Sequence, residues 1–240
     1  MKCKKILTAL LAAACTMSGC HGDLDIMQDN KLSASNMWID ESDAETATYG
    51  IYLYMRDALK SVHDIYLCWG EFRNGLWGAG TNKTLSGVDQ TQVRTSTMSS
   101  SNAYADWSVM YKTVNQANLI LKHVPEMGIS ESVRNFSLGN AYFSRAWCYF
   151  WIARIWGDAP LALTGYESTA GDLYLPRAPK AEIFARIESD LTEAERYVTD
   201  NSDKAVATPA AVQMLKADYA LWMYLSLIHI SEPTRPISIS

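Results

Sequence analysis

The chain has 240 residues, enough for one large domain or a domain and a half. Hydrophobic residues make up 48% of the sequence and charged residues 20%, which is typical of a globular protein with a substantial core and not of a disordered one. The formal charge of −5 argues against a nucleic-acid-binding surface, because such a surface needs clustered Lys and Arg to pair with phosphates.

The N-terminal segment has the layout of a secretory signal. Three lysines precede an apolar run over residues 6–14, and this run is too short to span a bilayer. Residues 17–20 (MSGC) then resemble the lipobox of bacterial lipoproteins, although an ordinary cleavage site followed by a chance cysteine is an alternative. We expect residues 1–19 to be a lipoprotein signal peptide, Cys20 to carry the lipid, and residues 20–40 to form an extended tether.

Apolar residues at three- and four-residue steps predict an all-α domain over residues 41–226. Residues 42–45 (SDAE) fit a capping box, which predicts that the first helix begins there. The expected helices run from this box to about residue 59, from about 103 to 124, from about 132 to 155, from 179, with Pro179 in the first turn, to 198, and from 209 onward. This alternation predicts stacked helical hairpins of the tetratricopeptide-like kind, although no strict sequence repeat is visible.

Residues 68–101 lack a helical period and are rich in Gly, Ser and Thr, so they predict a long glycine-rich loop. Glycine permits backbone bends that expose neighbouring side chains to a ligand. Anchoring of the loop tryptophans to the helical core is the alternative role, since Trp is usually largely buried. The candidate ligand-binding residues of this loop are Trp69, Arg73, Asn74, Trp77 and Asn82.

The other chemically capable residues of the mature chain give weaker signals. Cys68 and Cys148 are the cysteines left after the leader and Cys20, and the sequence leaves open whether they pair or stay as buried thiols. The histidines show no metal-ligand spacing, and neither a phosphate-binding loop nor a GxSxG motif is convincing. No cofactor is therefore expected. Three acids lie opposite an apolar helical stripe and predict a solvated face, namely Asp190, Glu193 and Glu195.

Four aromatic residues of the helix over residues 132–155 are spaced three and four apart. This spacing predicts that they pack in the core and do not form a ligand platform. They are Tyr142, Phe143, Trp147 and Phe150.

Several motifs, in the same order, resemble the SusD/RagB-like outer-membrane nutrient-binding lipoprotein family. The most specific is residues 140–150 (NAYFSRAWCYF) continuing into 154–160 (RIWGDAP), which is similar to the family pattern EARFLRAxxYFxLVxxFGDVP. Weaker matches are residues 111–118 (YKTVNQAN), 187–194 (IESDLTEA) and 207–217 (ATPAAVQMLKA). Asn140 departs from the family, which has an acid at this position.

Membership would imply a surface-exposed, lipid-anchored protein of the outer membrane that binds oligosaccharides without catalysis. It would act with a SusC-like TonB-dependent transporter and would have no enzyme activity. An oligopeptide-binding member of the family and a helical-repeat scaffold for protein interactions are the alternatives.

The C-terminal tail departs from the resemblance. The family's chains are about twice as long as this one, and residues 227–240 do not continue the last predicted helix. We expect these residues to be non-native sequence.

Overall fold

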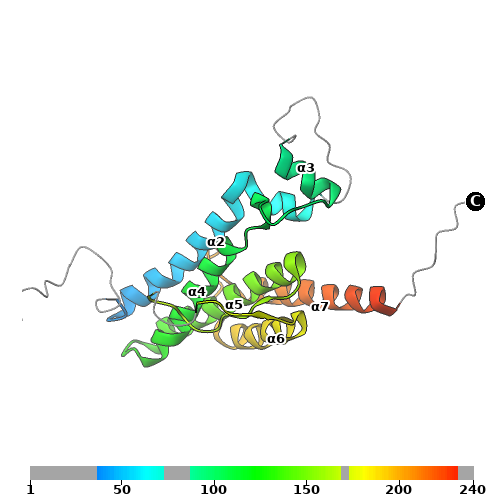
Figure 1. Ribbon diagram of the computed structural model, residues 1–240. Coiled ribbons are helices and arrows are strands. Elements are labelled where there is room, and N and C mark those ends of the chain that lie inside the picture. Colours follow the sequence, from blue (N-terminus) through cyan, green and yellow to red (C-terminus); the bar gives the residue numbers. More distant parts are fainter. Residues whose placement is uncertain (1–36, 73–86, 169–172, 232–240) are drawn as a thin grey trace, which may run out of the picture. The chain divides into compact units, whose positions relative to one another are not determined.

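The computed structural model describes residues 37–72, 87–168 and 173–231, and this part of the chain is mainly helical (Figure 1). The expected signal peptide, Cys20 and most of the expected tether lie outside the described residues. The helices are α2 (Glu41–Gly70), α3 (Val88–Thr95), α4 (Ser108–His123), α5 (Glu131–Trp156), α6 (Lys180–Tyr197) and α7 (Pro209–Ser231), with short 3-10 turns η2 (Ala103–Ala105) and η3 (Val124–Glu126). The all-α prediction is confirmed.

One short β-ribbon interrupts the helices. Its strands β1 (Ala159–Pro160) and β2 (Arg177–Ala178) pair antiparallel and close the segment between α5 and α6. These strands were not predicted, because a two-residue strand is too short to show an alternating pattern.

The first helix begins slightly earlier and ends much later than predicted. Its capping box is formed by Asp40 and Asp43, so the box predicted at residues 42–45 is wrong by two positions. An aspartate caps a helix as well as a serine does. The helix continues to Gly70 because the buried stripe does not stop at residue 59: Ile65 and Cys68 are both in the core.

Part of the predicted loop over residues 68–101 is also helical. The short helix α3 lies within it and buries only Val93, so it has no apolar stripe from which it could be predicted. The Asn102 side chain joins it to the following segment by donating hydrogen bonds to the Asp89 carbonyl oxygen (3.1 Å) and to the Gln92 amide oxygen (2.8 Å).

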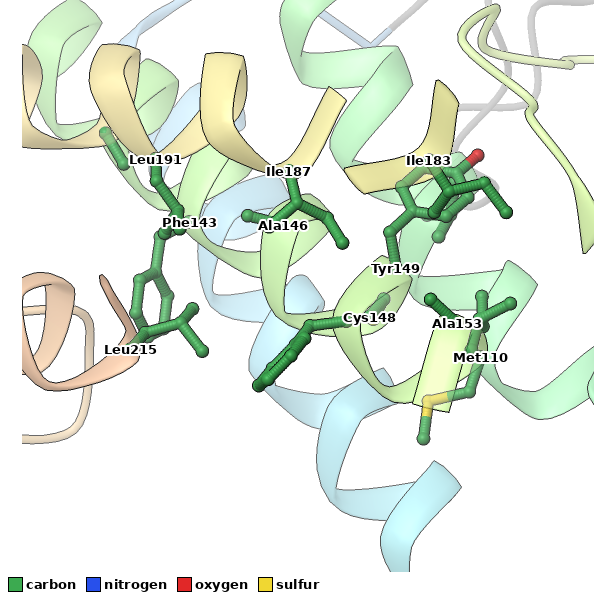
Figure 2. Close-up of a cluster of buried hydrophobic side chains, with 14 of the residues drawn as sticks. Met110, Phe143, Ala146, Cys148, Tyr149, Ala153, Ile183, Ile187, Leu191 and Leu215 are labelled. Atoms are coloured by element: carbon green, nitrogen blue, oxygen red, sulfur yellow. The ribbon is translucent and has the colours of Figure 1, made fainter. Parts of the chain in front are cut away.

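Helix α5 is the centre of the described domain. It contacts α2, α4, α6 and α7, and its apolar residues are buried on several sides. Figure 2 shows Ile183, Ile187 and Leu191 of α6 lying over Ala146 and neighbouring residues of α5. This confirms the predicted apolar stripe of α6. Gly139 permits the close approach of α5 to the end of α6, because a Cβ atom there would lie 2.8 Å from Val198 Cγ2 and 3.0 Å from the Val198 backbone nitrogen.

The prediction of a solvated face that includes Asp190 is wrong. Asp190 is fully buried and pairs with Arg145 of α5 through two hydrogen bonds of 2.7 Å, from Nε and Nη2. Arg145 Nη1 also donates to the Asn118 amide oxygen of α4 (2.8 Å). A bidentate pair of this kind satisfies both charges where water is excluded. Glu195 is exposed and Glu193 is half-exposed, as the prediction expected.

Helix α7 packs against α6 and α5, and Val212 and Leu215 of its predicted inner stripe are buried. Thr208 caps it, as predicted, by accepting a hydrogen bond from the Ala211 amide. The helix runs to Ser231, so the expectation that the helix does not continue past residue 226 is wrong for residues 227–231. Residues 232–240 lie outside the described residues, and the non-native origin of residues 227–240 stays a prediction. No helix in the described ranges combines the length and the apolar character needed to cross a bilayer.

Candidate functional site

Of the five predicted ligand-binding residues, only Trp69 belongs to the described part of the chain. Arg73, Asn74, Trp77 and Asn82 lie outside the described residues. Trp69 stands in the last turn of α2, directly before that segment, and its side chain is half-buried.

The contacts of Trp69 fix the orientation of its indole. The indole Nε1 donates a hydrogen bond to the Tyr104 carbonyl oxygen (2.9 Å). Its ring lies edge-on to Trp156, with 5.2 Å between the ring centroids, and is tilted against Trp151 at 6.0 Å. Trp69 is thus anchored to the helical core, and its ring keeps a partly exposed surface.

Trp69 is the middle member of a line of five tryptophans, which we call the tryptophan row. In spatial order they are Trp107, Trp156, Trp69, Trp151 and Trp147, with successive ring centroids 6.1, 5.2, 6.0 and 5.7 Å apart. All five are half-buried. They come from α2, from the N-cap of α4 and from α5, so the row joins three helices into one aromatic surface.

The tryptophan row also corrects the prediction for the aromatic residues of α5. Phe143 and Phe150 are buried in the core, as predicted. Trp147 is half-buried and ends the row, whereas Tyr142 is half-buried and stacks on Tyr197 at 6.1 Å. The helical period therefore identifies the side of the helix that faces the core but not the residues at the edge of that side.

The buried polar and nucleophilic groups near the tryptophan row serve the fold. Cys68 and Cys148 are free and buried, so the disulfide alternative is wrong. Burial raises the pKa of Cys68, and it raises the pKa of Cys148 to about 12. Both thiols are consequently protonated at neutral pH and are poor nucleophiles. Burial likewise raises the pKa of Tyr104 to about 12, and its hydroxyl accepts a hydrogen bond from the Gln90 amide (3.0 Å).

A groove of about 490 Å³ begins at Trp107, the terminal member of the row. One wall is α4, which contributes Tyr111 and Asn115, and the other is the chain that follows α5. The lining residues are Trp107, Ser108, Tyr111, Val114, Asn115, Asn118, Pro160, Ala162, Tyr166, Leu173, Tyr174 and Leu175. We call this feature the aromatic groove. No local sequence pattern predicts this groove, because its aromatic residues come from two separate segments of the chain.

No group of three or more His, Cys, Asp or Glu side chains is placed to bind a metal ion in the ranges that the structure describes. The described polar residues that line the aromatic groove are uncharged amides and hydroxyls. Two guanidinium groups lie over rings of the tryptophan row, Arg177 over Trp107 at 4.8 Å and Arg154 over Trp151 at 5.6 Å. This arrangement suits non-covalent binding of a ligand with ring-shaped apolar faces and polar edges.

Comparison with known proteins identifies a family. A family model named SusD-like and described as "Starch-binding associating with outer membrane" matches residues 78–225. A curated SusD-like protein of Formosa agariphila is 24% identical over 214 residues, which are 89% of this chain and 41% of the relative. The chain therefore spans about two fifths of that relative's length.

Solved structures show the same fold. A SusD-like protein of Bacteroides fragilis superposes with a TM-score of 0.65 at 22% identity, covering 78% of this chain and 36% of the other. A laminarin-binding SusD-like protein superposes with a TM-score of 0.64 at 17% identity, covering 77% of this chain and 41% of the other.

Proposed function

The chain belongs to the SusD-like family, and we propose from this membership that it binds oligosaccharides at the outer membrane and does not transform them. The observation that carries the proposal is the family match over residues 78–225, whose description is starch binding. The tryptophan row supports it, because aromatic rings provide the flat apolar faces on which sugar rings stack.

Within this proposal, Trp69, Arg73, Asn74, Trp77 and Asn82 bind the ligand. Trp69 is the fixed end of the group, since its indole is hydrogen-bonded to Tyr104 and packed on Trp156. The guanidinium group and the amides are suited to hydrogen-bond sugar hydroxyls, while the indoles supply apolar contact.

Attachment and delivery complete the proposed role. A lipid on Cys20 anchors the protein to the outer membrane, on the cell surface, and residues 20–40 separate the anchor from α2. The bound oligosaccharide passes to a SusC-like TonB-dependent transporter. A non-catalytic role is in keeping with the protonated thiols of Cys68 and Cys148 and with the structural pairing of Asp190.

Affinity gel electrophoresis with soluble polysaccharides tests the binding role. We expect wild-type protein to be retarded by at least one glycan, and Trp77→Ala to lose most of this retardation with an unchanged near-UV circular dichroism spectrum. Tyr224→Ala is the matched control, because Tyr224 is an exposed aromatic residue on α7, remote in sequence from the proposed site. Glycan cleavage during the assay would contradict the non-catalytic role, and retention of peptides alone would favour an oligopeptide-binding member.

The anchor has its own test. We expect the wild-type chain to incorporate a labelled fatty acid and to sediment with outer membranes, and Cys20→Ala to do neither. Normal membrane association of Cys20→Ala would contradict lipid anchoring at this residue.

A further inference from the structure

The aromatic groove has a rigid wall. The Asn115 amide donates to the Tyr166 carbonyl oxygen (3.0 Å), and its oxygen accepts from the Tyr166 backbone nitrogen (2.7 Å). The Asn118 amide donates to the carbonyl oxygens of Ala162 (2.9 Å) and Thr164 (3.3 Å). These bonds fix residues 162–166 to α4, so this part of the groove wall is held in place before any ligand binds.

Close backbone packing adds to this rigidity. Gly165 is buried against α4, where a Cβ atom would lie 2.9 Å from the Leu119 backbone nitrogen and 3.0 Å from its Cα. Any other residue at position 165 would therefore push the wall away from the helix. A preformed groove of about 490 Å³ is within the usual size range of small-ligand sites, roughly 300–1,000 Å³.

None of the described residues that line the groove is charged. Three of the described charged side chains contact lining residues: Arg177, whose guanidinium carbon lies 4.8 Å from the Trp107 ring centroid; Asp106, which accepts a hydrogen bond from the Ser108 hydroxyl (2.9 Å); and Arg145, which donates to the Asn118 amide oxygen (2.8 Å). Arg177 and Asp106 are exposed and have opposite signs, whereas Arg145 is buried and paired with Asp190. An ionic ligand would lose water in this groove, and the solvent-exposed charges of Arg177 and Asp106 would compensate only weakly, which is unfavourable. The lining therefore selects a neutral ligand.

The polar atoms of the groove favour a ligand that donates hydrogen bonds. The Tyr111 hydroxyl already donates to the Pro160 carbonyl oxygen (2.6 Å), and the Ser108 hydroxyl donates to Asp106. Each hydroxyl has one hydrogen, so the capacity that remains on these oxygens is for accepting. Sugar hydroxyl groups are suitable donors, whereas an apolar peptide side chain has none to offer.

The rim of the groove exposes apolar surface. Tyr174 is 92% exposed and Leu173 is 42% exposed, and both stand on the wall opposite α4. Large exposed apolar residues beside a preformed groove are typical of binding sites. A sugar ring between the walls would cover this surface and would meet aromatic rings from both sides.

We propose that the aromatic groove is a second oligosaccharide site, separate from the Trp69–Asn82 site, and that it takes uncharged pyranose units in preference to uronic, sialic or sulfated sugars. This inference rests on the proposed glycan-binding function and adds to it a second binding site and a preference for uncharged sugars. Trp107 belongs to both the tryptophan row and the groove, so one glycan chain could extend along both.

Isothermal titration of the purified full chain tests the second site. The probes are neutral gluco-oligosaccharides and oligogalacturonate, each measured at low and at high salt. We expect neutral probes to bind with little salt dependence and oligogalacturonate to bind more weakly. Tyr174→Ala should weaken neutral binding by about 2- to 10-fold, the range expected for loss of one aromatic contact. Tyr224→Ala, which removes an exposed tyrosine of α7, should leave binding unchanged.

The outcomes separate this proposal from the general function. If Trp77→Ala abolishes glycan binding and Tyr174→Ala binds as the wild type does, the second site is refuted and the general function stands. Equal or stronger binding of oligogalacturonate would also overturn the second site, as would binding of apolar peptides alone in a Tyr174-dependent manner. If the wild-type chain binds none of a broad glycan panel, both proposals fail.

Discussion

Helices α5 and α7 are both apolar around most of their circumference, yet their surroundings differ. Helix α5 contacts four other helices, and the residues facing those helices are buried. Among the described helices, α7 packs mainly against α5 and α6. Three of its large apolar residues stay exposed: Met214 (74%), Leu221 (57%) and Tyr224 (63%). An all-round apolar helix is normally covered on all sides.

The contrast shows what composition can and cannot reveal. Apolar residues all around a helix indicate that more than one of its faces is suited to packing against a neighbour. In α5, other described helices cover these faces. The outer face of α7 has the same character without a described partner. Composition thus identifies the faces that are suited to burial but not the neighbour that buries them.

The first prediction concerns the buried ion pair between α5 and α6. Asp190→Ala leaves the guanidinium of Arg145 buried without its carboxylate partner, and we expect a loss of about 3–5 kcal/mol in unfolding free energy. Urea denaturation measures it. Arg186, whose Nη1 lies 3.6 Å from Asp190, also loses a partner.

Glu193→Ala is the matched control for this variant. Glu193 pairs with Arg196 on the surface at 3.8 Å, so its removal should cost less than about 1 kcal/mol. Equal losses of unfolding free energy in the two variants would refute the special role of the buried pair. They would also weaken the distinction between α5, which is covered by other helices, and α7, which is partly exposed.

Asp190 also shows which kind of contact could not be predicted from the sequence. The apolar stripe of α6 was predictable, because helical periodicity is local, and its residues Ile183, Ile187 and Leu191 are buried. The pairing of Asp190 with Arg145 joins residues 45 positions apart, and no local pattern contains it. Both residues belong to the motifs that resemble the family, which was the available signal.

The candidate site was predictable only in part for the same reason. Trp69 was identified from the start of the predicted loop over residues 68–101, but its neighbours Trp151 and Trp156 come from another helix and were not predicted to lie near it. The aromatic groove brings together Tyr111 and Tyr174, which are far apart in the chain. Convergence of this kind depends on how helices pack, and one sequence gives no direct signal for it.

The second prediction compares a buried with an exposed apolar residue. Ile187 of α6 is fully buried against α5, so Ile187→Ala should reduce unfolding free energy by about 2–5 kcal/mol through lost contacts and a residual cavity. Met214→Ala on α7 should change it by less than about 0.5 kcal/mol, because Met214 is 74% exposed. Urea denaturation of both variants measures the difference, and a large loss in Met214→Ala would show that the outer face of α7 is covered in solution.

The third prediction addresses that face directly. Met214→Lys combined with Leu221→Lys replaces exposed apolar area by charge, so we expect unfolding free energy to stay within about 1 kcal/mol of wild type and self-association to decrease. Sedimentation velocity over a range of concentrations measures the association. Unchanged association together with a marked loss of stability would mean that these residues are buried within the folded chain.

The smallest expected effect lies at the exposed link between α6 and α7. The pKa of Glu195 is lowered, first by the hydrogen bond from Lys216 and then by the one from Gln213. A carboxyl group whose folded-state pKa is lowered contributes stability above its unfolded pKa, near 4.5, and that contribution is lost as pH falls through the folded-state value. Glu195→Gln should therefore melt slightly below wild type at neutral pH and at the same temperature in strong acid. Thermal melts at several pH values measure this, and a difference that persists in acid would assign the effect to packing and not to charge.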